Sequence, residues 1–288
     1  MKIYITAKAW HLAGKFWKPA ITFREAPATK EKDICYGLNR KVTRGGINFM
    51  DNIAYITGTS RGIGRALAEA LLDDGWSVTG ISRQKTLEHP EYKHLALDIS
   101  APWQQWLPQI FANHQEARRL LLINNAATLG EVGYMGHIAP EAVAAAIALN
   151  VTAPALLMNE FIKCYPKQQK LVLNISSGAG QYPVDGWSIY CSSKAALDML
   201  TEVGAHETEL IKRNNLQFFS VSPGVVDTGM QEQIRHTDKK AFSRVVYFQQ
   251  LKSGKRLADP AEVARQLMML VNHPKEFKAV KQDVRKME

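Results

Sequence analysis

Short apolar runs alternate with longer segments of helical period along most of the chain. Six strands are expected, at 52–57, 77–82, 93–97, 119–124, 170–175 and 216–221, and five helices, at 62–74, 102–113, 140–164, 188–213 and 259–272. Strands joined by helical crossovers form parallel sheets. Strands that are nearly continuous apolar runs, such as L-L-L-I at 120–123, are typical of sheets buried on both faces. The pattern therefore predicts a single α/β domain built on a doubly wound parallel sheet.

The pattern changes near Met50. Residues 1–49 show no sustained period, and the domain is expected to occupy 50–288. Three interpretations of the first segment stay open. It is upstream sequence with Met50 as the true start, a flexible basic extension, or a targeting peptide with a Lys-rich amphipathic stretch at Lys2–Lys18.

Charge is distributed unevenly over the 288 residues. Residues 1–49 carry ten Lys or Arg against three Asp or Glu, a formal charge of +7, whereas the other 239 residues carry 26 against 24, or +2. The basic character of the chain therefore belongs to its first segment. It is poor evidence that the domain binds nucleic acid, and no nucleic-acid partner is expected.

Cysteine and histidine usage limits the possible metal and redox chemistry. The three cysteines, Cys35, Cys164 and Cys191, form no C-x-x-C pair, and the histidines form no ligand-like cluster, so we expect neither a disulfide framework nor a metal site. No uninterrupted apolar run approaches the roughly 20 residues that span a membrane. The expected class is a cytoplasmic enzyme that is not bound to a membrane.

A glycine-rich turn follows the first expected strand. It reads T-G-T-S-R-G-I-G at 57–64 and opens the expected helix 62–74. Glycines let the backbone turn tightly and approach a pyrophosphate, and a helix N-terminus offers free N–H groups to it. The expected cofactor contacts here are Gly58, Ser60, Arg61, Gly62, Ile63 and Gly64.

Charge at the end of the second expected strand indicates which dinucleotide binds. An NAD site places a carboxylate there, on the ribose 2′-OH. The sequence instead reads G-I-S-R-Q at 80–84. Arg83, together with Arg61, offers guanidinium groups suited to a 2′-phosphate, so NADP(H) is the expected cofactor.

A reactive constellation is expected near the start of the helix 188–213. Tyr190 and Lys194 are four residues apart, which places both side chains on one helix face. A neighbouring ammonium stabilises a phenolate, so we expect Lys194 to lower the pKa of Tyr190 toward working pH. Ser177, at the end of the strand 170–175, makes the Tyr190–Lys194 pair a more specific indication of a reactive site.

These motifs together resemble the short-chain dehydrogenase/reductase family, over residues 52 to about 272. The T-G-x-x-x-G-x-G turn, L-D-I at 97–99, N-N-A at 124–126, Y-x-x-x-K and P-G-V-V-D-T at 223–228 occur in the family's order, with Ala127 where glycine is usual. The resemblance implies a Rossmann-type fold. It also implies further cofactor contacts at Asp98 on the adenine, at Asn125 and Ala126 beside the sheet, and at Pro223, Gly224, Val226 and Thr228, of which Val226 and Thr228 hold the nicotinamide carboxamide.

The resemblance also assigns roles to the reactive residues. Ser177 is expected to hydrogen-bond the substrate carbonyl, Tyr190 to donate the proton, and Lys194 to bind the nicotinamide ribose. Asn150 matches an asparagine that helps to hold a relay water. Ser176 is the nearer competitor for the serine role, but the spacing to Tyr190 favours Ser177.

The segments 174–191, 223–231 and 250–264 look closer to one branch of the family, the benzil reductases and more loosely the sepiapterin reductases. Apolar walls are expected from Ala179, Tyr182, Trp187 and Met230, and the segment 229–252 is expected to be a lid. The resulting hypothesis is an NADPH-dependent reductase of one carbonyl of a 1,2-diketone. The alternatives are a sepiapterin-type or general aldehyde/ketone reductase, and a non-catalytic NADP(H) sensor. The resemblance also implies a homo-oligomer paired through the helices at 150–164 and 188–213.

Overall fold

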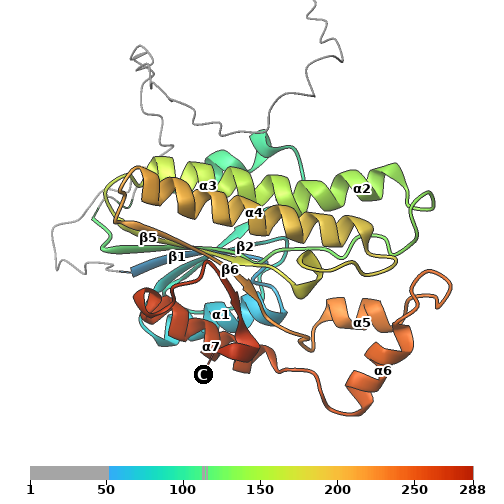
Figure 1. Ribbon diagram of the computed structural model, residues 1–288. Coiled ribbons are helices and arrows are strands. Elements are labelled where there is room, and N and C mark those ends of the chain that lie inside the picture. The colour runs from blue at the N-terminus through green and yellow to red at the C-terminus, as the bar shows by residue number, and fades with distance from the viewer. Residues whose placement is uncertain (1–51, 112–113, 115, 288) are drawn as a thin grey trace, which may run out of the picture. The chain divides into compact units, whose positions relative to one another are not determined.

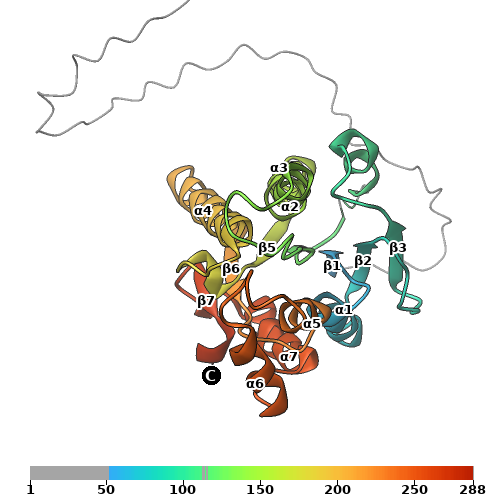
Figure 2. The ribbon, with the colours of Figure 1, turned by 90° about the vertical axis from the view of Figure 1, so that its right-hand side faces the viewer.

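A fully parallel sheet of seven strands forms the centre of the protein, in the order β3-β2-β1-β4-β5-β6-β7 (Figure 2). The computed structural model describes residues 52–111, 114 and 116–287, all within one compact unit of the chain, so the predictions for 1–49 lie outside the described residues. The strands are β1 (Asn52–Thr57), β2 (Ser77–Ser82), β3 (Tyr92–Ala96), β4 (Arg119–Asn124), β5 (Gln169–Ile175), β6 (Leu216–Ser222) and β7 (Lys281–Asp283). The predicted doubly wound parallel sheet is confirmed.

Helices cover both faces of the sheet (Figures 1 and 2). One face carries α1 (Gly62–Asp73) and α7 (Pro260–Asn272), and the other carries α2 (Pro140–Ile147), α3 (Ala153–Cys164) and α4 (Ser188–Leu210). Strand residues alternate between the two cores: Leu121 packs with the α1 and α7 side chains, whereas Leu120 and Leu122 pack with those of α3. Burial on both faces explains why the strands read as continuous apolar runs.

The order of the strands fixes where a ligand binds. The chain runs outward from β1 through β2 to β3, then crosses back to β4 beside β1 and continues outward to β7. The carboxyl ends of β1 and β4 therefore lie at the point where the winding direction reverses. Ligands of open α/β sheets bind in the crevice at that point.

The predicted helix 102–113 is wrong. Its described part contains two short 3₁₀ turns, Trp103–Gln105 and Leu107–Gln109. Pro102 precedes the first turn and Pro108 lies inside the second, and proline removes the N–H that a continuing α-helix needs. The apolar side chains Trp106, Leu107 and Ile110 still pack into the core, which explains the misleading period.

Three elements were not predicted as such. Besides β7 at the sheet edge, the structure has α5 (Gly229–Arg235) and α6 (Val245–Ser253), both within the segment expected to form a lid. Figure 1 shows these two helices beyond the sheet on the side of α1 and α7. Each of these helices is only two to three turns long, so its apolar residues do not repeat often enough to reveal a helical period in the sequence.

The expected helix 140–164 is confirmed with an interruption. A π-helical turn, Ala148–Thr152, joins α2 to α3. By length and composition the combined segment Pro140–Cys164 is apolar enough to cross a membrane, with a mean hydropathy of 1.6, which a search for uninterrupted apolar runs does not reveal. In the structure it forms part of the helical layer on the sheet, and Asn150 in its centre is buried.

Candidate active site

The glycine-rich turn between β1 and α1 leaves no room for side chains. Gly58 and Gly62 have φ angles of +77° and +60°, the left-handed region that favours glycine. A Cβ at Gly64 would lie 2.3 Å from Nδ2 of Asn125 and 2.4 Å from the Gly58 oxygen. Ser60, Arg61 and Ile63 lie in the same turn and at the start of α1. The backbone is thus open to a phosphate group at the N-terminus of α1, as binding of a dinucleotide requires.

Thr57 joins this turn to the end of β4. Its hydroxyl oxygen accepts hydrogen bonds from the backbone N–H groups of Asn125 and Ala126, at 3.0 Å each. The Asn125 amide donates to the carbonyl oxygens of Thr57 (2.9 Å) and Gly58 (3.2 Å). Sequence reasoning identified Asn125 and Ala126 but missed Thr57, although it is the first letter of the T-G motif.

The two predicted phosphate-binding arginines have different surroundings. Arg83 is exposed just after β2, and its charge contributes to lowering the pKa of Asp98, which is set mainly by hydrogen bonds from Ser100. The Arg61 guanidinium lies over Gly229 at the start of α5, where an added Cβ would come within 3.1 Å of its Nη1. Arg83 is therefore the arginine that the structure associates with the end of β2.

The segment after β6 reaches back to the glycine-rich turn. Gly224 follows Pro223 with a φ of +78°, and Val226 is buried and forms a β-bridge with Ala258. Thr228 precedes α5, and its methyl carbon would lie 3.2 Å from a Cβ at Gly62. The predicted carboxamide contact Thr228 and the phosphate turn thereby lie next to each other.

The helix α4 begins just before Tyr190 and places Tyr190 and Lys194 one turn apart. The Ser177 side chain hydrogen-bonds with the Tyr190 side chain and accepts from the Ala179 N–H at 3.2 Å. Lys194 donates from Nζ to the Ile175 carbonyl oxygen at 2.8 Å, and Nζ lies 5.7 Å from the centre of the Tyr190 ring. Ser176 has a buried hydroxyl without a partner among the described residues, so Ser177 is the serine that contacts the tyrosine.

The pKa of the tyrosine differs from the prediction. Burial raises the pKa of Tyr190 to about 12, opposed by the hydrogen bond with Ser177. Burial also lowers the pKa of Lys194 to about 8, opposed by the charge of Asp198. The direction is opposite to the lowering that the sequence predicted, because desolvation is the largest cause of the shift in the Tyr190 pKa.

Asn150 lies in the π-helical turn and is almost fully buried. Its side-chain oxygen accepts from the Thr128 N–H at 2.9 Å, and its amide donates to the Thr128 carbonyl (2.8 Å) and to the Ser193 hydroxyl (3.1 Å). Ser193 in turn donates to the Tyr190 carbonyl oxygen at 2.8 Å. Asn150 therefore fixes the backbone around Tyr190, and its role toward a relay water stays a prediction.

Three of the four predicted substrate walls belong to one apolar cluster. Trp187 stacks on Phe242 with ring centres 5.0 Å apart and meets the Tyr190 ring edge-on at 5.8 Å. Ala179 is buried in the same cluster and Met230 packs against it, whereas Tyr182 is 55% exposed. Phe242 and Phe248 come from the predicted lid, where sequence reasoning named no aromatic contact. The segment 229–252 therefore packs directly on the start of α4, where Tyr190 lies.

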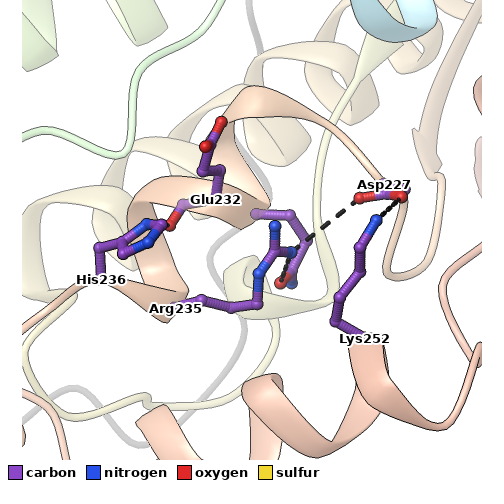
Figure 3. Close-up of polar contacts among 6 residues, drawn as sticks. Asp227, Glu232, Arg235, His236 and Lys252 are labelled. Atoms are coloured by element: carbon purple, nitrogen blue, oxygen red, sulfur yellow. Dashed lines mark hydrogen bonds and ion pairs between the residues drawn. The ribbon is translucent and has the colours of Figure 1, made fainter.

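Charged residues hold the lid to the segment after β6. Asp227 forms ion pairs with Lys252 of α6 and with Arg235 of α5, the latter at 4.0 Å (Figure 3). Arg235 also donates to the Gln231 side-chain oxygen at 3.2 Å. His236 lies on the other side of α5, with its Nδ1 2.9 Å from the Glu232 carbonyl oxygen. Ion pairs thus connect both helices, α5 and α6, to Asp227.

Comparisons with known proteins agree with this geometry. The family model described as short chain dehydrogenase matches residues 52–239. A benzil reductase ((S)-benzoin forming) of Bacillus subtilis (strain 168) is 35% identical over 225 residues, which cover 75% of this chain and 91% of the relative. A sepiapterin reductase of Mus musculus is 33% identical, covering 76% and 91%. The crystal structure of the KRED1-Pglu enzyme has a TM-score of 0.67 at 25% identity, covering 76% and 94%. The chain belongs to the short-chain dehydrogenase family of oxidoreductases.

Proposed function

We propose that the protein is an NADPH-dependent carbonyl reductase that converts one carbonyl of a 1,2-diketone to a hydroxyketone. The observation that carries this proposal is the hydrogen bond between Ser177 and the buried Tyr190, beside Lys194 and within an apolar aromatic cluster. Such a pair binds a carbonyl oxygen and supplies a proton to it, and the cluster accommodates an apolar body attached to that carbonyl.

The residues act on the oxygen of the substrate. NADPH held at the glycine-rich turn would supply a hydride to the carbonyl carbon, which leaves negative charge on the carbonyl oxygen for the protein's residues to stabilise. Tyr190 donates its phenolic proton to that oxygen, and Ser177 stabilises the oxygen by a hydrogen bond. The ammonium of Lys194 stabilises the phenolate that remains, which then recovers a proton from water. Since its pKa is about 12, Tyr190 holds its proton at neutral pH and is ready to donate it.

The two residues at the end of β2, Ser82 and Arg83, favour NADP(H) over NAD(H). Ser82 and Arg83 occupy the place where a carboxylate would bind a ribose 2′-OH. Asp98, the carboxylate expected to contact the adenine, accepts hydrogen bonds from Ser100 at its Oδ1. A guanidinium at this place pairs with a 2′-phosphate. The corresponding test is Arg83→Ala beside Arg61→Ala, and an unchanged preference for NADP(H) in both variants contradicts the assignment.

Two findings support the diketone. The relative from Bacillus subtilis is a benzil reductase, and benzil is an aromatic 1,2-diketone. The apolar cluster around Tyr190 contains three aromatic rings besides the tyrosine. Flat aryl groups stack favourably on such rings. A sepiapterin-type reduction is the second candidate, favoured by the relative from Mus musculus.

A substrate panel tests the proposal. Purified protein with NADPH is offered benzil, an alkyl 1,2-diketone, sepiapterin and a simple aldehyde, while NADPH oxidation and product chirality are measured. We expect the highest kcat/KM for a diketone. Turnover of sepiapterin alone indicates the second candidate, and no NADPH oxidation with any diketone rejects the first.

The variant Tyr190→Phe tests the mechanism. It removes the proton donor and leaves the ring packing against Trp187 in place, so turnover is expected to fall by about 10²–10⁴-fold while NADPH binding persists. Full activity in the variant contradicts the mechanism. Cofactor binding without turnover of any carbonyl by the unaltered protein indicates a sensor of NADP(H) instead.

A further inference from the structure

We propose that His94 is a positioning residue for cofactor selectivity, anchoring Ser82 so that the turn 82–84 presents Arg83 to the 2′-phosphate of NADP(H). The proposal rests on the proposed use of NADP(H). His94 lies on β3, one strand away from the residues usually read for dinucleotide preference, and it belongs to none of the motifs described above.

Four side chains form a hydrogen-bonded chain that links the turn after β1 and the carboxyl end of β2 to Tyr92 and His94 of β3. Tyr92 Oη and Thr59 Oγ1 are 2.8 Å apart, and Thr59 Oγ1 lies 3.4 Å from Ser82 Oγ. His94 Nε2 lies 3.0 Å from Ser82 Oγ. Thr59 and Ser82 are buried, so these groups depend on one another for their hydrogen bonds.

The direction of every proton in the chain follows from Ser82. Its hydroxyl donates to the Gln84 carbonyl oxygen at 2.9 Å, and a serine has one proton and two lone pairs. Ser82 must therefore accept from both Thr59 and His94. Thr59 has then used its own proton, so it accepts from Tyr92. His94 consequently carries hydrogen on Nε2.

The neutral form of His94 supplies this donor at working pH. Burial lowers the pKa of His94, and the charge of Lys85 lowers it further, against a hydrogen bond with the Ser82 backbone that raises it. Besides Lys85, the ionisable group that faces the imidazole is Tyr92, whose ring centre is 6.4 Å away. The imidazole is thus a neutral donor in a fixed tautomer.

The bond from Ser82 to the Gln84 carbonyl closes a tight turn with Arg83 at its centre. Side-chain-to-backbone bonds of this kind fix the local backbone. Without the donor on His94, one lone pair of Ser82 loses its partner and the hydroxyl is free to leave the Gln84 carbonyl. The backbone at Arg83 then loses its constraint, and its guanidinium no longer has a fixed position toward the ribose.

Selectivity is measured as the ratio of the dissociation constants of NAD⁺ and NADP⁺, by calorimetry without substrate. His94→Leu is expected to lower this ratio roughly fivefold, the size of one net hydrogen bond, with little change in NAD⁺ affinity. His94→Gln places an N–H donor near the former Nε2 and is expected to keep the ratio. His89→Leu is the matched control, since His89 is an exposed histidine between β2 and β3 whose Nδ1 accepts from the Glu91 N–H.

Two further measurements keep the result decisive. Ser82→Ala is expected to lower the ratio as His94→Leu does, and the double variant is expected to lose no more than either single one. Nitrogen-15 spectra of the ligand-free protein are expected to show His94 as the neutral Nε2–H form. An Nδ1–H form, an unchanged ratio in His94→Leu, or an equal loss in His94→Gln overturns the proposal.

Arg83→Ala separates this inference from the proposed function. A wild-type protein without preference for NADP⁺ refutes the proposed cofactor. If the wild type prefers NADP⁺ and Arg83→Ala removes that preference while His94→Leu does not, the cofactor assignment stands and the role of His94 is wrong.

Discussion

Two buried lysines with similarly lowered pKa values allow a direct test of what the active site costs in stability. Lys194 beside Tyr190 and Lys170 in β5 are 3% and 4% exposed, and burial lowers the pKa of each from 10.5 to about 8. Lys170 lies near the amino end of its strand, whereas Ser177 follows the carboxyl end. Lys170 is therefore a matched control outside the site.

The magnitude follows from the pKa values. A change from 10.5 to about 8 means that the folded state disfavours each ammonium by roughly 3 kcal/mol. Each ammonium also donates to a backbone carbonyl, of Ile175 or Gln168, and losing that bond costs about 1–2 kcal/mol. Replacing either lysine by methionine is thus expected to raise the free energy of unfolding at pH 7 by about 1–2 kcal/mol.

The sign depends on pH in a defined way. Below pH 8 both folded and unfolded chains hold the proton, so the wild type carries the whole penalty. Between pH 8 and 10.5 the unfolded chain still binds a proton that the folded chain has released, so the stability of the wild type rises with pH. Above 10.5 the penalty is gone. The gain of each methionine variant is therefore expected at pH 7 and is expected to disappear by about pH 10.5.

Urea unfolding at pH 7 and pH 10.5, with kcat measured in parallel, provides the assay. Lys194→Met and Lys170→Met are both expected to be more stable at pH 7, by about 1–2 kcal/mol in the free energy of unfolding. Only Lys194→Met is expected to lose turnover. A variant that is less stable than the wild type at pH 7, or a gain of equal size at both pH values, refutes the reasoning.

Three other predictions concern packing, the lid and assembly. Gly64→Ala is expected to weaken cofactor binding at least tenfold by calorimetry, because its Cβ would lie 2.4 Å from a backbone oxygen, whereas Gly133→Ala meets nothing within 3.6 Å and should bind normally. Asp227→Asn is expected to raise KM with little loss of stability, since the ion pairs that it breaks are partly exposed; an unchanged KM contradicts a role in holding the lid. Met199→Glu on α4 is expected to dissociate the proposed homo-oligomer, because Met199 is 58% exposed beside other apolar residues of that helix; an unchanged sedimentation profile contradicts pairing through it.

Local signals were enough to predict the framework of the site. The positive φ angles of Gly58 and Gly62 are needed wherever a strand turns directly into a helix around a phosphate, so their spacing indicates the structure without tertiary information. The four-residue separation of Tyr190 and Lys194 likewise requires one helix face. In both cases the decisive contacts lie within one turn of the backbone.

Other features depend on which distant segments cover them. The rise in the pKa of Tyr190 results from burial, and part of that burial comes from Trp187 packed with Phe242, more than 50 residues away along the chain. The bond between Ser82 and His94 joins two strands whose pairing register no local pattern specifies. Charge and propensity along the sequence therefore cannot predict the pKa of Tyr190 or the hydrogen bond between Ser82 and His94.

Burial shifts the two catalytic pKa values in opposite directions for a single reason. Desolvation disfavours any charged form, so it raises the pKa of the acid Tyr190 and lowers that of the ammonium Lys194. At neutral pH both groups still hold their protons, Tyr190 because its pKa is about 12 and Lys194, as an ammonium, because its pKa of about 8 lies above the solution pH. Phe242 and Phe248, from the segment around α5 and α6, form part of the cover that excludes water. Packing of the segment 229–252 against Tyr190 thereby contributes to the burial that raises the pKa of the tyrosine.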